Sequence, residues 1–187
     1  IIDRFRNRIP IEAEEVDTII RKRLLAKTAD GNAILQDYYK KNSGQISDIT
    51  NLVGTGLKKT TDAKTYADYY PFYEHQFKML QYFLFGTHKL VKTQVGTRGM
   101  LISAFDVLKK ETMADRDIFV HVNASQLCRN AEESVPESLR ARYNQADEHL
   151  TDIKLKFVVG HDMLQTIHFL TESGAKTTVE NISRAYV

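Results

Sequence analysis

Arg98 directly follows Thr97, and the sequence predicts that Thr97 is the N-cap of a helix running to about Lys110. Apolar residues recur at helical spacing behind this start: Met100, Leu101, Ala104, Phe105 and Leu108. An arginine at a helix start presents a fork of N–H donors where the helix dipole already favours anions, an arrangement that suits phosphate oxygens. The alternative interpretation is a first-turn arginine that pairs with a nearby acidic side chain.

The other motifs that could perform chemistry are incomplete. The segment Gly54–Thr60 has the composition of a phosphate-binding loop but not the GxxxxGK[ST] spacing, so we interpret it as a basic surface loop. His161 has no third ligand at helical spacing besides Asp162 or His168, which favours a surface or packing role over a metal site. Cys128 is a lone cysteine without a glycine-rich surrounding, typical of a small buried hydrophobe. We therefore predict that the chain alone is not catalytic and holds no metal.

The elements that would position these residues are mostly helices. Apolar periodicity predicts helices over residues 12–27, 33–41, 71–85, 97–110, 138–157 and 162–172, a short helix after residue 42, and a further helix that begins at residue 177. Asp30-Gly31-Asn32 is expected to separate the first two helices. Strand patterns occur only at residues 8–11 and 117–123, and the second of these is also compatible with a helix start. The fold class is therefore predicted to be mainly α with one or two short strands.

The composition is that of a soluble globular protein. The 187 residues are 42% hydrophobic and 27% charged, and the net charge of +2 argues against a protein that binds nucleic acid through phosphate attraction alone. The single cysteine leaves no internal disulfide, which indicates a reducing, intracellular compartment. No apolar run approaches the ~18 residues of a membrane span, and no signal-peptide pattern opens the chain. The sequence predicts a cytoplasmic protein with no membrane partner.

Several segments are similar to those of one known family. They are Asp3-Arg4-Phe5 with Arg8-Ile9-Pro10-Ile11, Val16–Lys27, Tyr69-Tyr70-Pro71-Phe72 with Gln76-Phe77 and Leu80, Gly96–Leu101 with Phe105, and the tail Thr178-Val179-Glu180-Asn181-Ile182. With these segments the chain resembles the large P-loop ATPases of BREX phage-defence systems. The resemblance extends over most of the chain, and the RF and KRLLAK segments together with the YPF and TRG segments are its distinctive parts.

The resemblance implies roles for three arginines in an AAA+-type ATPase. Arg4, with Arg6 as the less favoured choice, would be the arginine finger that reaches the nucleotide of a neighbouring subunit. Arg98 would be sensor 2, which contacts the γ-phosphate of the nucleotide in its own subunit. ATP and Mg²⁺ would be cofactors of the full-length protein, and none is expected for this chain alone. The full-length protein would form a homo-oligomer through its ATPase core, with other defence-system proteins as partners.

The resemblance also implies a division of the chain. Residues 1–12 would end the ATPase core, residues 13–115 would form an AAA+-type helical lid, and residues 116–187 would form a C-terminal helical region. The Walker motifs would lie upstream of Ile1, because the chain contains none. The chain starts without methionine and stops at Val187 inside an expected helix, so we expect it to be a fragment of a longer protein.

The C-terminal region has the pattern of the start of a helix-turn-helix. An apolar helix leads through the turn Ser173–Lys176 to Thr177-Thr178, which would cap a second helix. Such a start is similar to that of a winged helix truncated at Val187, because a recognition helix would have to follow. DNA is therefore a partner in the alternative function, that of a helical DNA- or protein-binding adaptor without nucleotide chemistry.

Overall fold

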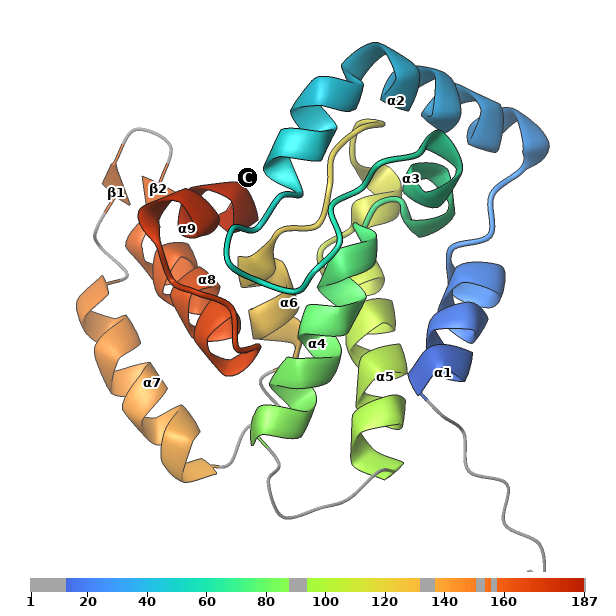
Figure 1. The fold of residues 1–187 in the computed structure, drawn as a ribbon. Coiled ribbons are helices and arrows are strands. Elements are labelled where there is room, and N and C mark those ends of the chain that lie inside the picture. The colour runs from blue at the N-terminus through green and yellow to red at the C-terminus, as the bar shows by residue number, and fades with distance from the viewer. Residues whose placement is uncertain (1–12, 88–93, 132–136, 151–153, 156–157, 187) are drawn as a thin grey trace, which may run out of the picture.

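The computed structural model describes residues 13–87, 94–131, 137–150, 154–155 and 158–186, and it is mainly helical as the sequence predicts (Figure 1). The elements are α1 (Ala13–Ile19), which continues into a π-helical turn (Ile20–Leu24), α2 (Ala29–Ile49), α3 (Ala63–Tyr69), α4 (Glu74–Thr87), α5 (Gln94–Lys110), a 3₁₀ turn (Met113–Asp115), α6 (Ala124–Ala131), α7 (Glu137–Leu150), β1 (Lys154–Leu155), β2 (Val158–Val159), α8 (Gly160–Glu172) and α9 (Val179–Tyr186). Within the described residues, no helix is both long enough and apolar enough to span a membrane.

The first two helices differ from the prediction in where they meet. The helix expected over residues 12–27 forms from Ala13 to Leu24, but the expected break at Asp30-Gly31-Asn32 is wrong. Thr28 is the N-cap of α2, because its Oγ1 accepts a hydrogen bond from the backbone N–H of Gly31 at 3.1 Å. With this cap, the turn-forming residues Asp30-Gly31-Asn32 lie in the first turn of α2. α2 then runs on through a kink at Asn42 to Ile49.

The strands also lie elsewhere than predicted. The first expected strand, residues 8–11, is outside the described residues. Residues 117–123 form no strand but lead into α6, and Asn123 caps that helix by accepting from the Gln126 N–H at 3.0 Å. They form an irregular segment in which Phe119 has a φ of 82° and the Val122 N–H donates to the Pro71 carbonyl at 2.9 Å. The two short strands β1 and β2 pair antiparallel, Lys154 with Val159, where the sequence predicts the end of a helix. That helix, α7, ends at Leu150.

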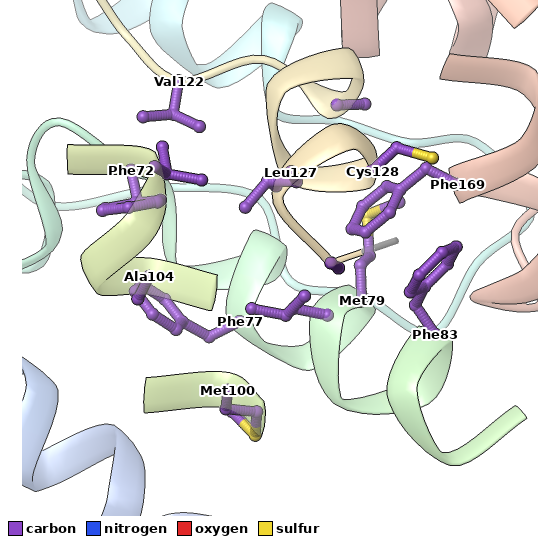
Figure 2. Packing of buried hydrophobic residues seen from close by; sticks show 14 of the residues in the cluster. Phe72, Phe77, Met79, Phe83, Met100, Ala104, Val122, Leu127, Cys128 and Phe169 are labelled. Carbon is purple, nitrogen blue, oxygen red and sulfur yellow. The ribbon is translucent and has the colours of Figure 1, made fainter. Parts of the chain in front are cut away.

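The main core lies where α4, α5, α6 and α8 meet, with α1 packed on the outer side of α5 (Figure 1). Large apolar side chains from these helices interdigitate, and Phe83, Leu127 and Phe169 are each at most 1% exposed (Figure 2). Burying one such side chain stabilises a fold by about 1.5–3 kcal/mol. The same core cluster extends from Val16 to Ala175, so it includes residues from both sides of the domain boundary expected at residue 115. That boundary stays a prediction.

A second, smaller cluster of buried residues joins α2 to α3. It consists of Leu35, Tyr39, Ile46, Tyr66, Ala67 and Tyr73. His121, from the irregular segment before α6, enters this cluster, because its ring stacks on Tyr73 at 4.7 Å and its Nε2 is 2.8 Å from the Tyr66 hydroxyl oxygen. The cluster fixes α2 across the ends of the helices that form the main core (Figure 1).

Candidate functional site

Arg98 lies in the second turn of α5, one turn further from the helix start than the sequence predicts. The helix begins at Gln94, so the prediction that Thr97 is the N-cap is wrong. Gly96 does not delay the helix, because a glycine in a helix interior costs only about 1 kcal/mol and breaks nothing by itself. The unsatisfied N–H groups of a helix are those of its first four residues. Arg98 follows them, so its contribution to binding an anion would come from its side chain.

The backbone beneath Arg98 is firmly packed while its side chain is exposed. Met100 is 2% exposed in the main core, and a Cβ at Gly99 would meet Leu84 Cδ1 of α4 at 3.2 Å, so α5 approaches α4 closely here. The Arg98 side chain itself is exposed, and it has no hydrogen bond or ion pair with any described residue. The nearby-acid interpretation therefore finds no partner among the described side chains. Arg98 is therefore a cation on a firmly packed helix, and no described residue occupies its donors.

Beyond Arg98, α5 presents apolar side chains to solvent at the same helical spacing. Leu101 is 39% exposed, Ile102 43% and Phe105 48%. Lys109 lies one turn further, with its Nζ 5.8 Å from the centre of the Phe105 ring. These residues follow Arg98 at positions i+3, i+4, i+7 and i+11, so they share one face of the helix. We call this set the α5 outer face.

The other two arginines of the sequence prediction, Arg4 and Arg6, lie outside the described residues. The structure therefore relates neither of them to Arg98.

The helix-turn-helix pattern forms as two helices joined by a tight turn. Gly174, with a φ of 73°, reverses the chain after α8, and Thr178 caps α9 by accepting from the Asn181 N–H at 3.2 Å. α9 carries a single basic residue, Arg184. The Arg184 guanidinium donates to the Asn51 carbonyl at 2.7 Å and forms ion pairs with Asp48 at 2.8 Å and Glu180 at 2.9 Å. α9 therefore offers no unpaired cation to a DNA phosphate.

The histidines considered for a metal site have separate partners. His161 pairs with Asp147 of α7, and His168 Nδ1 lies 3.7 Å from the Cys128 Sγ of α6. Cys128 is fully buried in the main core, as expected for a small hydrophobe. In the part of the chain that the structure describes, no three histidine, cysteine or acidic side chains gather closely enough to hold a metal ion.

A cavity that the sequence did not predict lies between α1, α4 and the loop after α2. Its volume is about 500 Å³, and its wall includes the cation of Arg21. Arg21 Nε donates to Asp17 Oδ2 at 3.1 Å, its Nη2 donates to Thr18 Oγ1 at 3.4 Å, and its guanidinium lies 5.2 Å from the centre of the Tyr69 ring. The Tyr69 hydroxyl donates to the same Asp17 oxygen at 2.9 Å. Burial, with the Asp17 charge beside it, raises the pKa of Tyr69, so the hydroxyl stays a donor.

Two residues that line the cavity each contain a buried polar atom with no hydrogen-bond partner among the described residues. The atoms are Asp17 Oδ1 and His75 Nδ1. His75 is 7% exposed, and burial lowers its pKa to about 4, so it is neutral at neutral pH. Leaving such an atom unsatisfied costs about 1–3 kcal/mol, which native proteins accept mainly where a ligand or water completes the bonding.

The cavity rim carries two lysines. Lys58 belongs to the basic loop Gly54–Thr60, and Lys78 lies on α4 with its Nζ 3.2 Å from Gln81 Oε1. Two threonine hydroxyls hold that loop: Thr55 Oγ1 donates to the Leu52 carbonyl at 2.7 Å, and the Thr60 N–H donates to Oγ1 of Thr50 at the end of α2, at 3.0 Å. The spacing of Asp17 and Arg21, four apart on a helix, was the one sequence signal that could have revealed part of this site.

Comparison with known proteins does not identify this fold. No protein-family model matches the chain. No solved structure matches it.

Proposed function

We propose that the chain is the lid and regulatory region of a nucleotide-driven P-loop ATPase related to those of BREX phage-defence systems, in which Arg98 senses the terminal phosphate of bound ATP. The observation that supports this role is the exposed Arg98 side chain, which no described residue pairs with, on a helix anchored in the main core. An arginine whose five donors are free suits the planar recognition of phosphate oxygens.

The support beneath Arg98 gives the role its physical basis. α5 packs against α4 and α1, and its inner residues Met100, Ala104 and Val107 are at most 2% exposed. A force on the Arg98 guanidinium would therefore move α5 together with the helices packed on it, because close-packed interiors transmit displacement. Contact with the γ-phosphate would couple nucleotide state to the position of the whole helical region.

The wider role follows the resemblance. In the full-length protein, ATP and Mg²⁺ would be bound by an ATPase core that forms a homo-oligomer, and Arg4, or failing that Arg6, would supply the arginine finger to a neighbouring subunit. A finger of this kind raises the rate of phosphoryl transfer by about 10³–10⁵. Other defence-system proteins would be the partners, and the cytoplasm the location.

Turnover by the intact ATPase tests the Arg98 assignment. Arg98→Ala should lower ATP turnover by about tenfold or more, since a hydrogen bond to a charged group contributes about 1.5–3 kcal/mol. The thermal midpoint should not change, because the side chain is exposed and has no described partner. Arg23→Ala is the matched control, another exposed arginine with no described partner, and its turnover should equal the wild type. Unchanged turnover in Arg98→Ala contradicts the assignment.

Mixed oligomers test the finger. Arg4→Ala should depress turnover, and mixing it with a subunit that cannot bind ATP should restore part of the activity if the arginine acts across the subunit interface. No recovery at any mixing ratio contradicts a finger acting in trans.

A second candidate is a helical adaptor without nucleotide chemistry, and the α5 outer face favours a protein partner for it. Exposed apolar side chains at helical spacing are a common means by which helices bind other proteins. For a DNA partner, a mobility shift on duplex DNA whose affinity falls linearly with the logarithm of salt concentration would be required. The adaptor replaces the ATPase proposal only if Arg98→Ala leaves ATP turnover unchanged and the chain binds DNA with this salt dependence or binds a protein through the α5 outer face.

A further inference from the structure

The cavity beside α1 has the construction of an anion-binding site. Arg21 is oriented from one side by Asp17 and Thr18 and from another by the Tyr69 ring. Its remaining terminal nitrogen, Nη1, has no hydrogen-bond partner among the described residues. A guanidinium fixed in this way loses little conformational entropy when a ligand arrives, which is the condition for strong recognition.

The charges around the cavity are unequal. Arg21, Lys58 and Lys78 carry three positive charges, while Asp17 and Glu74 carry two negative ones. The Asp17 charge is directed at Arg21 and Tyr69, since its Oδ2 accepts from both. Lys58 pairs with no described residue. Lys78 contacts only neutral groups, Gln81 Oε1 and the Tyr82 ring, whose centre is 5.1 Å from its Nζ. The cations therefore retain capacity for an external anion.

The rest of the wall would accommodate an organic body. Phe77 and Met100, which are 4% and 2% exposed, line the inner part of the cavity together with Leu57. Polar residues also line the cavity, among them Thr18, His75 and Gln81. A volume of about 500 Å³ is typical of small-molecule sites and exceeds that of a single phosphate ion.

We propose that this cavity binds the phosphate group of a small molecule, with Arg21 as the principal ligand and with Lys58 and Lys78 as supporting cations. The phosphate oxygens accept from the Arg21 terminal nitrogens and from the two ammonium groups at the rim. The ligand chemistry is a phosphate carried on a sugar or nucleoside, whose body lies against Phe77 and Met100. The site is separate from Arg98, which is not part of the cavity wall, and it requires no ATPase core.

Calorimetric titration of the 187-residue chain at low ionic strength tests the proposal. The probes are AMP, ribose 5-phosphate, inorganic phosphate and adenosine. AMP and ribose 5-phosphate should bind, and adenosine should not. Equal binding of inorganic phosphate would support phosphate recognition and assign the site to the free ion, whereas weaker binding would assign it to the organic phosphates. No binding by any phosphate probe at about 10 mM, or binding by adenosine equal to that of AMP, overturns the proposal.

Substitutions locate the binding. Arg21→Gln should weaken the affinity for the tightest phosphate probe by at least about tenfold, and Lys78→Gln by about two- to fivefold. Arg23→Gln and Lys40→Gln are the controls, because they remove the same charges from exposed positions outside the cavity wall. If Arg21→Gln fails to fold, the exposed pair Lys58→Gln with Lys78→Gln decides, with an expected loss of about tenfold. Affinity unchanged in the folded variants, or lowered equally in the controls, overturns the site.

Discussion

The side chain of Asn181 forms hydrogen bonds with both backbone groups of Val53. Asn181 Oδ1 accepts from the Val53 N–H at 2.8 Å, and its Nδ2 donates to the Val53 carbonyl at 3.0 Å. The same Nδ2 donates to the Lys176 carbonyl at 2.9 Å, and Asn181 is fully buried. One amide therefore fastens the loop after α2 to the start of α9, and this loop also carries Lys58 of the proposed phosphate site.

Asn181→Ala should lower the free energy of unfolding by about 2–4 kcal/mol, because three hydrogen bonds are lost and backbone groups at a partly buried contact are left without partners. Urea unfolding measures the change. Asn51→Ala is the control, since Asn51 is exposed and offers only its backbone carbonyl to Arg184. An equal loss in both variants contradicts the special role of Asn181.

Replacing Gly174 and Gly44 by alanine should change the stability of the protein in opposite directions. Gly174 has a φ of 73°, so Gly174→Ala should destabilise the protein by about 1 kcal/mol through backbone strain alone. Gly44 lies exposed in α2 with no atom within 4 Å of an added Cβ, so Gly44→Ala should stabilise by about 0.5–1 kcal/mol through helix propensity. Thermal unfolding of both variants gives the signs, and a stabilising Gly174→Ala contradicts the observed turn.

Stability should rise between pH 4 and pH 6.5. Burial lowers the pKa of His75 and of His121 to about 4, whereas histidine in an unfolded chain titrates near 6.5. In this window the unfolded chain binds more protons than the folded one, so the free energy of unfolding increases with pH, by up to about 1.4 kcal/mol per pH unit for each histidine. The stability they contribute is complete above pH 6.5 and is lost as the pH falls toward 4.

His75→Gln should remove part of this slope, whatever its effect on stability at neutral pH. His149→Gln should leave the slope intact, because His149 is exposed on α7. Urea unfolding at intervals from about pH 4.5 to about pH 7 gives the slope of the free energy of unfolding against pH. A His75→Gln slope equal to that of the wild type would mean that His75 titrates normally in the folded protein.

Local patterns predicted most of the helices, but they missed α3 and α6 and the starts of some others. Thr177-Thr178 predicted a helix start, and of the two, Thr178 caps α9. The same reasoning predicted a break at Gly31, and this break does not form. The cap by Thr28 contributes about 1 kcal/mol, which offsets the cost of one glycine in the helix. The local sequence predicts a cap at Thr97, because no residue near it indicates that the helix has already begun at Gln94.

Long-range contacts account for what the sequence could not predict. The bonds of Asn181 reach Val53 across 128 positions, and no local pattern records them. The proposed phosphate site joins Arg21, Lys58 and Lys78, three residues from separate elements whose convergence depends on how α1, the loop and α4 pack. Arg98, in contrast, was singled out from its neighbours in sequence, and its exposure agrees with the role proposed for it.

The most direct test of the central proposal compares the affinities of the full-length protein for ATP and for ADP with and without the Arg98 guanidinium. If Arg98 contacts the γ-phosphate, Arg98→Ala should weaken ATP binding by about tenfold or more and change ADP binding by less than about twofold. Arg98→Lys should recover part of the loss, because it keeps the charge without the fork of donors. Equal affinities of wild type and Arg98→Ala for ATP, or an equal loss for both nucleotides, would contradict it.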